Sequence, residues 1–234
     1  MRRRIALALL ASAIATPGSA GAAEQIVQLR ATDGTALVAT FYPAAGGPAP
    51  AVVLVPMLTR TREDWRPFAE RLQSAGATSL ALDLRGHGGS SGSAAPSAAM
   101  GLDVQAAVAW LAARSDVRPA AIGIVGASFG GTAAVLAAAE APAVKAVAVL
   151  SPSADYRGVR LDGGLRKYGS RPLLLVTSTE DPYALRTARA LTEDEAPGRQ
   201  LRLSTVAAHG SRLLDRDPEL VAALVDWLRQ TLLF

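Results

Sequence analysis

The chain has 234 residues, half of them hydrophobic, and a formal net charge of +4. It contains no cysteine, which excludes a disulfide framework, a thiolate nucleophile and a cysteine-ligated metal. Three of the positive charges belong to arginines at the amino terminus, and the other basic residues are scattered without a basic run that includes aromatics. Nucleic-acid binding therefore has little support, and we expect no such partner.

The amino-terminal segment is typical of a secretory signal peptide. The three arginines precede an apolar run that begins at Ile5, and Ala20-Gly21-Ala22 is the best cleavage signal. An uncleaved membrane anchor is the alternative, but the apolar run is shorter than the roughly 20 residues that a membrane-spanning helix needs. We therefore expect residues 1–22 to direct export to the periplasm or the medium, and residues 23–234 to form one α/β domain without stable membrane insertion.

The apolar periodicity of the mature chain predicts a doubly wound α/β fold. A hairpin with an Asp-Gly turn comes first, and buried strands then alternate with amphipathic helices, the pattern of a mostly parallel sheet covered on both faces. The predicted strands are residues 26–30, 36–42, 51–56, 78–84, 121–126, 144–150, 172–178 and 200–206. The predicted helices are residues 63–76, 101–115, 129–141, 182–195 and the segment from 218 onward. An eight-stranded sheet of this kind places functional residues beyond the carboxyl ends of its strands.

The segment GASFGG, residues 126–131, is the main candidate for chemistry. It fits the G-x-S-x-G pattern between a buried strand and a helix, where glycines leave room for a strained turn that presents a serine nucleophile. The same segment has the glycine and threonine spacing of a phosphate-binding loop, but it lacks the lysine that belongs between Gly131 and Thr132. Ser128 is therefore a predicted nucleophile, and a simple packing turn is the alternative.

A serine hydroxyl needs a base, and the chain has only two histidines. His87 precedes Ser128 in the sequence and is interpreted as a loop residue of a Gly-rich turn, with a contact to the substrate as the alternative. His209 follows the last predicted strand. It alone satisfies the order serine, acid, histidine that accompanies this nucleophile turn, so His209 is the predicted base.

The acid should end a strand between the predicted nucleophile and base, because from there it can orient the histidine. Asp181, in the segment STEDP, fits best. Glu180 and Asp155 are the alternatives. Structural roles also remain open, since Asp181 can cap the helix that follows it and Asp155 can form an Asx turn.

With these motifs, the mature chain resembles the α/β-hydrolase superfamily over nearly all of its length. The resemblance depends on GASFGG, STEDP, AHG and the loop DLRGHGGSSG, and it is closest to small esterases without a cap domain and to dienelactone-hydrolase-like proteins. The dienelactone hydrolases themselves have cysteine where this chain has Ser128. The resemblance implies that Ser128 is the nucleophile, His209 the general base and then acid, and Asp181 the orienting acid, with no cofactor and no metal.

The resemblance further implies an oxyanion hole formed by the backbone N–H groups of Leu58 and Phe129. Here the chain departs from the family, which usually ends the third strand with His-Gly where this sequence has Pro56-Met57. Backbone donors need no particular side chain, so the hole is still expected. The alternative is a strand end and loop without this role.

Residues 151–171 are too few for a cap domain, so an open site is expected. Met57 and Tyr156 are candidates for its substrate pocket. The basic residues of this segment are interpreted as solvated charges, with an anionic substrate as the alternative partner. The charged cluster at residues 60–66 is interpreted as a solvated helix start.

Together these patterns predict an exported serine hydrolase that cleaves a small-molecule carboxylic ester through an acyl-enzyme. An amidase, peptidase or thioesterase with the same three residues is one alternative, because a triad does not select the leaving group. A non-catalytic binding protein on the same fold is the other, and Pro56-Met57 is its support.

Overall fold

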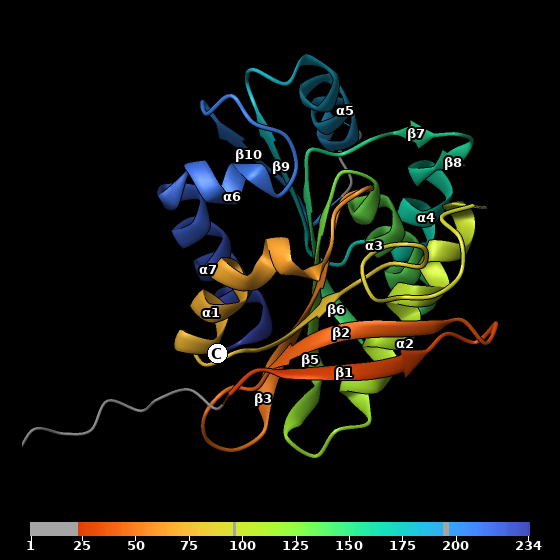
Figure 1. The fold of residues 1–234 in the computed structure, drawn as a ribbon. Helices are drawn as coiled ribbons and strands as arrows, with labels where there is room; N and C mark the ends of the chain where they lie inside the picture. Colours follow the sequence, from red (N-terminus) through yellow and green to blue (C-terminus); the bar gives the residue numbers. More distant parts are fainter. Residues whose placement is uncertain (1–22, 96, 194–196) are drawn as a thin grey trace, which may run out of the picture.

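The computed structural model describes residues 23–95, 97–193 and 197–234. An eight-stranded sheet runs through the middle of the molecule, with helices on both sides (Figure 1). The strands lie in the order β1-β2-β4-β3-β5-β6-β9-β10. The predicted signal peptide, residues 1–22, lies outside the described residues.

The predicted strands and helices are present, with small changes at their ends. The strands of the sheet are β1 (Gln25–Arg30), β2 (Ala36–Tyr42), β3 (Ala49–Val55), β4 (Thr78–Leu82), β5 (Val117–Ala127), β6 (Val144–Leu150), β9 (Leu173–Ser178) and β10 (Arg199–Ser204). The helices are α1 (Arg66–Ser74), α2 (Met100–Ala112), α3 (Phe129–Glu140), α4 (Leu161–Tyr168), α5 (Pro182–Glu193), α6 (Arg212–Arg216) and α7 (Pro218–Leu232), with short 3-10 turns η1 (Arg62–Trp65) and η2 (Ser97–Ala99). Strands β7 (Asp155–Tyr156) and β8 (Val159–Arg160) form a separate hairpin.

Strand direction confirms the predicted fold class. Strand β2 is antiparallel to both of its neighbours, β1 and β4, while the other neighbouring pairs in the sheet are parallel. Parallel neighbours require crossover connections, and helices supply them here. The result is the doubly wound, mostly parallel sheet with antiparallel amino-terminal strands that the sequence predicts.

The buried strand residues divide between two cores because successive side chains point to opposite faces of a sheet. In β3, Val53 and Val55 belong to the core under α2 and α3. Val52 and Leu54 belong to the core under α1 and α7. Both faces are therefore covered, and the central strand β3 contains only apolar, buried residues, as the sequence indicates.

The segment at residues 151–171 contains the hairpin β7-β8 and helix α4, neither of which was predicted. Helix α4 packs directly on α3: a Cβ added at Gly164 would lie 2.9 Å from Leu136 Cδ2. This whole segment is described, and its elements lie against the domain. The expectation that no cap domain is inserted here is confirmed.

The interpretation of residues 60–66 as solvated is wrong for Arg62. Its side chain is only 15% exposed, and its guanidinium pairs with the carboxylate of Asp83, which is fully buried at the end of β4. The backbone N–H of Arg62 also donates to Asp83 Oδ1 at 2.7 Å. A buried carboxylate needs a counter-charge, and Arg62 provides it. Arg60 and Arg66, at 39% and 42% exposure, are surface charges as expected.

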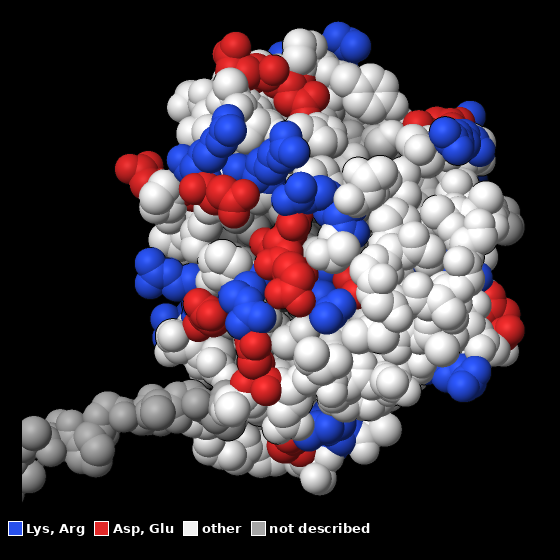
Figure 2. All heavy atoms as spheres, in the orientation of Figure 1, with Lys and Arg blue, Asp and Glu red and all other residues white. Residues whose placement is uncertain are grey.

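Acidic and basic side chains are interspersed on the face shown in Figure 2 and do not form separate patches. Among residues 23–95, 97–193 and 197–234, every helix is too short or too polar to span a bilayer.

Candidate active site

Ser128 lies at the turn between β5 and α3. Its backbone has φ 50° and ψ −121°, a conformation that residues with a Cβ rarely adopt. The N–H of Ser128 donates to the carbonyl of Leu150 at 2.7 Å, which ties this turn to the end of the neighbouring strand β6. Strain of this kind persists only where the surroundings enforce it, and it is common at active sites. The predicted strand-turn-helix context of Ser128 is confirmed.

The glycines around Ser128 are required by close packing. A Cβ added at Gly126 would lie 2.5 Å from the carbonyl oxygen of Gly130, and one at Gly130 would lie 2.3 Å from that of Pro56. At Gly131 it would lie 2.3 Å from Val149 Cγ1 of β6. No side chain fits at these distances, so the motif holds the turn, helix α3 and the loop after β3 tightly together.

His209 and Asp181 form a hydrogen bond, with Nδ1 of His209 2.6 Å from Oδ2 of Asp181. Asp181 follows β9, and His209 lies in the loop after β10, so neighbouring parallel strands bring the two together. An ionised carboxylate only accepts hydrogen bonds, so it places the proton on Nδ1 and leaves Nε2 as the acceptor. This is the arrangement that a general base for a serine hydroxyl needs.

The other candidate acids and the second histidine lie elsewhere. Asp155 Oδ1 accepts the N–H of Gly158 at 2.8 Å inside the β7-β8 hairpin, which is a turn role. Glu180 is exposed, and its N–H donates to Ser178 Oγ. His87 Nδ1 contacts the carbonyl of Arg85 within its own loop. The structure therefore brings Asp181, and none of these three, to His209.

The loop that carries His209 contacts the strand end that carries Ser128. A Cβ added at Gly210 would lie 3.5 Å from Ala127 Cβ and 2.8 Å from Met57 Sδ. Within the described part of the chain, Ser128 Oγ forms no hydrogen bond. Such bonds are often long without substrate and shorten when it binds. Asp181 and His209 are thus joined by a hydrogen bond. Ala127, the residue before Ser128, lies beside Gly210, the residue after His209.

The backbone of the loop after β3 reaches the amino end of α3. The close approach of the Pro56 carbonyl to Gly130 brings the loop that carries Leu58 against this helix end. Phe129 is the first residue of α3, where N–H groups lack an intrahelical acceptor. Leu58 is half-buried and packs against the core on the α3 side. The loop that carries Leu58 and the amino end of α3 therefore lie side by side.

Both pocket candidates lie next to residues of the site. The rings of Tyr156 and Phe129 are tilted, with centroids 5.1 Å apart. Met57 Sδ would lie 2.8 Å from a Cβ added at Gly210, so Met57 packs against the residue that follows His209. The guanidinium of Arg157 lies 5.5 Å from the centre of the Tyr156 ring. The other basic residues of this segment form exposed ion pairs or bind backbone carbonyls, namely Arg160, Arg166, Lys167 and Arg171.

Sequence reasoning missed Ser151, the residue after β6. Its side chain is fully buried, and its Oγ accepts the N–H of Gly210, the neighbour of His209, at 2.9 Å. The segment LSPS carries no pattern that marks this serine. Its only signal is its position at the end of a strand beside β5, because open α/β sheets gather functional residues beyond the carboxyl ends of their strands.

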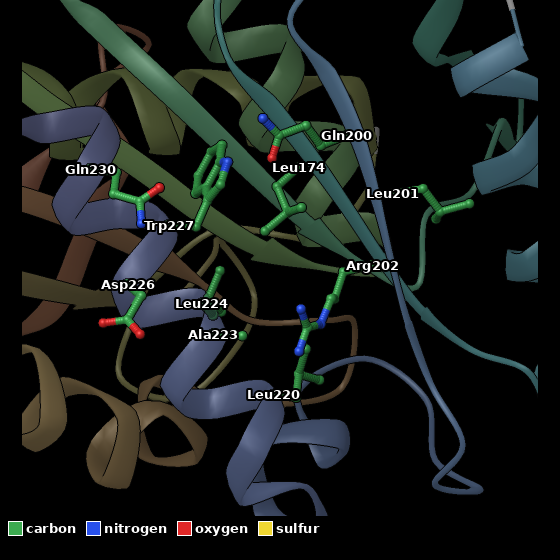
Figure 3. Close-up of a pocket in the computed structure, with 10 residues that line it drawn as sticks. All are labelled: Leu174, Gln200, Leu201, Arg202, Leu220, Ala223, Leu224, Asp226, Trp227 and Gln230. Carbon is green, nitrogen blue, oxygen red and sulfur yellow. The ribbon is translucent and has the colours of Figure 1, made fainter.

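A cavity of about 370 Å³ lies elsewhere, between strands β9 and β10 and helix α7 (Figure 3). Leu174, Leu224 and Trp227 line it together with polar residues such as Arg202. None of the predicted site residues contributes to its wall. It is therefore separate from the candidate active site.

Comparison with known proteins gives a family. A family model described as X-Pro dipeptidyl-peptidase (S15 family) matches residues 33–230. Among curated proteins, an uncharacterised protein of Mycobacterium tuberculosis is 33% identical over 117 residues. That match covers 50% of this chain and 41% of the relative, so the chain spans less than half the length of this relative.

Among solved structures, an esterase of Pyrococcus furiosus superimposes with a TM-score of 0.75 at 19% identity, covering 90% of this chain and 91% of that one. A dienelactone hydrolase of Anabaena variabilis gives 0.72 at 22% identity, covering 90% and 97%. Identities this low show a shared fold. The family match covers most of the chain and names a hydrolase family. The chain therefore belongs to the X-Pro dipeptidyl-peptidase (S15) family and has the α/β-hydrolase fold.

Proposed function

We propose that the protein is an exported serine hydrolase that cleaves small carboxylic esters, with Ser128 as nucleophile, His209 as base and Asp181 as orienting acid. The observation that carries the proposal is the 2.6 Å contact between His209 Nδ1 and Asp181 Oδ2, beside the strained turn of Ser128. A histidine held by a carboxylate beside a half-buried serine on a strained turn is the constellation of nucleophilic acyl transfer.

The proposed reaction has two stages. Ser128 Oγ attacks the ester carbonyl while His209 Nε2 takes its proton, and the N–H groups of Leu58 and Phe129 stabilise the oxyanion. Protonation of the alkoxide by His209 releases the alcohol and leaves an acyl-enzyme. Water activated by His209 then cleaves the acyl-enzyme and frees the carboxylic acid. Tyr156 and Met57 border the reacting centre and are the proposed contacts for the substrate.

Two considerations favour a small ester as substrate. Residues 151–171 form only a short hairpin and helix α4 beside the site, so no large domain restricts access there. The structural neighbours include proteins named as an esterase and as a dienelactone hydrolase. A peptidase is the second candidate, and the description of the matched family favours it.

The first test is hydrolysis of p-nitrophenyl acetate by the mature chain and by Ser128→Ala. We expect the variant to lose several orders of magnitude in turnover, because the nucleophile is removed. Ser74→Ala is the matched control, since this exposed serine bonds only the carbonyl of Glu70 in α1. Wild-type turnover in Ser128→Ala would overturn the assignment.

A second assay distinguishes the two candidate substrates. An X-Pro p-nitroanilide presents an amide to the same nucleophile, so the ratio of kcat/KM for ester and anilide compares the two reactions directly. We expect a clear preference for the ester. A preference for the anilide would favour the peptidase.

Export is tested separately, by determining the amino-terminal sequence of the protein recovered outside the cytoplasm. We expect this sequence to begin near residue 23.

A further inference from the structure

Ser151 has three features that an ordinary strand-end residue lacks. Its backbone is in the left-handed region, with φ 52°, where a Cβ is unfavourable. Its side chain is fully buried. Its hydroxyl reaches across 59 residues of sequence to accept the N–H of Gly210 at 2.9 Å. A strained, buried residue whose hydroxyl serves a distant loop indicates a specific role.

The pair Leu150 and Ser151 connects the three strand ends that carry the proposed triad. The carbonyl of Leu150 accepts the N–H of Ser128 at 2.7 Å. The N–H of Ser151 donates to the carbonyl of Val176 in β9, the strand that precedes Asp181, also at 2.7 Å. The Ser151 hydroxyl then holds Gly210, which follows His209. One dipeptide thus contacts the nucleophile turn, the acid strand and the histidine loop.

The contacts that hold the histidine loop near His209 involve its ring and the backbone of Gly210. The imidazole is 47% exposed, so packing alone does not fix it, and its ring is held at Nδ1 by Asp181. Gly210 also packs against Met57 and Ala127. Its carbonyl accepts the N–H of Leu213 at 3.2 Å, and Arg216 donates to the carbonyl of Ala207. A ring held at one atom can still pivot about that bond. A hydrogen bond to the adjacent backbone, from the N–H of Gly210 to Ser151 Oγ, limits this movement of the ring.

We propose that Ser151 is a positioning residue, whose buried hydroxyl fixes the backbone at Gly210 and so aims His209 Nε2 at Ser128. This inference rests on the proposed function, in which His209 is the base. Loss of the hydroxyl leaves the N–H of Gly210 without its acceptor and lets the loop shift. A shift of about 1 Å between base and nucleophile lowers the rate of the chemical step by about 100-fold.

Two variants separate positioning from stability. Ser151→Ala and Ser151→Gly both remove the hydroxyl, but glycine adopts a φ of 52° freely, so Ser151→Gly should have the higher Tm. If Ser151 only stabilises the fold, turnover should recover in Ser151→Gly. Ser79→Ala is the matched control, because the Ser79 hydroxyl is buried and has no hydrogen-bond partner among the described residues.

The readouts are kcat and KM for p-nitrophenyl acetate, the rate of Ser128 labelling by a fluorophosphonate, and hydrogen exchange of the Gly210 amide. We expect kcat and labelling rate to fall by about 10- to 100-fold in both variants, with KM nearly unchanged. The Gly210 amide should exchange faster in both. Ser79→Ala should match the wild type in all three.

Wild-type kcat and labelling in Ser151→Gly, or unchanged exchange at Gly210, would overturn the role of Ser151 while the ester hydrolase assignment stands. A wild-type protein that neither hydrolyses the ester nor reacts with the fluorophosphonate would overturn the proposed function instead. Hydrogen exchange would then still test the anchor at Gly210.

Discussion

Asp181 uses both oxygens of its carboxylate. Oδ2 contacts His209 at 2.6 Å, and Oδ1 accepts the N–H of Ala184 in the first turn of α5 at 3.2 Å. Asp181 therefore caps α5 and binds His209 at the same time, so its role as a helix cap is compatible with the proposed role as orienting acid. The helix contact fixes the carboxylate, and a fixed carboxylate holds the imidazole better than a mobile one. The hydrogen bond that caps α5 therefore also fixes the carboxylate that contacts His209.

The stability of the fold depends on the ion pair between Arg62 and the buried carboxylate of Asp83. Asp83 is fully buried, and Arg62 neutralises it from the start of the 3-10 turn η1. We expect Arg62→Ala to lower the free energy of unfolding by about 3 kcal/mol, because the variant leaves a buried carboxylate without a counter-charge. Urea unfolding followed by tryptophan fluorescence measures this change.

Arg60→Ala is the control for this prediction. Arg60 is 39% exposed and pairs with Asp64 on the surface, so its loss should cost less than about 1 kcal/mol. Equal losses in the two variants would contradict the account of Arg62 as the counter-charge of Asp83.

At the scale of elements, the contact between α3 and β6 sets the position of the nucleophile turn. Gly131 lies so close to the strand that a Cβ would meet Val149 Cγ1 at 2.3 Å. We expect Gly131→Ala to lower the free energy of unfolding by about 1 to 3 kcal/mol through overpacking. The double variant Gly131→Ala, Val149→Ala makes room for the new methyl, so its loss should be smaller than the sum of the two single losses.

Gly163→Ala serves as the comparison in another helix. In α4 the nearest atom to an added Cβ at this position is Arg166 Nη2 at 3.9 Å, an ordinary contact. Alanine is the better helix former, so this variant should gain about 0.5 to 1 kcal/mol. Strictly additive losses in the Gly131 and Val149 pair, measured by chemical unfolding, would contradict the packing explanation.

The elements that sequence predicts best are those whose pattern is long and uninterrupted. Strand β6 occurs at the predicted residues 144–150, because its apolar run is bounded on both sides. Helix α4 was missed because Gly163 and Gly164 weaken the helical signal, although Gly164 allows its close packing on α3. Helix α6 has only five residues. Such short elements depend on tertiary contacts that no local pattern records.

The residues of the candidate site also differ in how well the sequence predicts them. Motif and chain order single out Ser128, Asp181 and His209, and the structure joins two of them by a hydrogen bond. Ser151 was missed because its role depends on two strands and a loop that meet only in the folded chain. The partner of Arg62 was missed for the same reason, since Asp83 lies 21 residues away in the sequence.

At the scale of the whole molecule, the order of strands in the sheet assembles the site. Strands β5, β6, β9 and β10 are consecutive neighbours and parallel, so their carboxyl ends lie along one edge (Figure 1). Ser128, Ser151, Asp181 and His209 follow these four strands in turn. The fold thus places residues that are far apart in sequence side by side, as expected beyond the carboxyl ends of a parallel sheet.

The central claim is that Ser128 becomes acylated with the help of His209. The direct measurement is mass spectrometry of the protein quenched in acid shortly after mixing with p-nitrophenyl acetate, followed by peptide mapping. The account predicts an acetyl adduct on Ser128 in the wild type, and a loss of several orders of magnitude in its rate of formation in His209→Ala. Ester turnover without an adduct on Ser128, or an adduct that forms equally fast in His209→Ala, would contradict it.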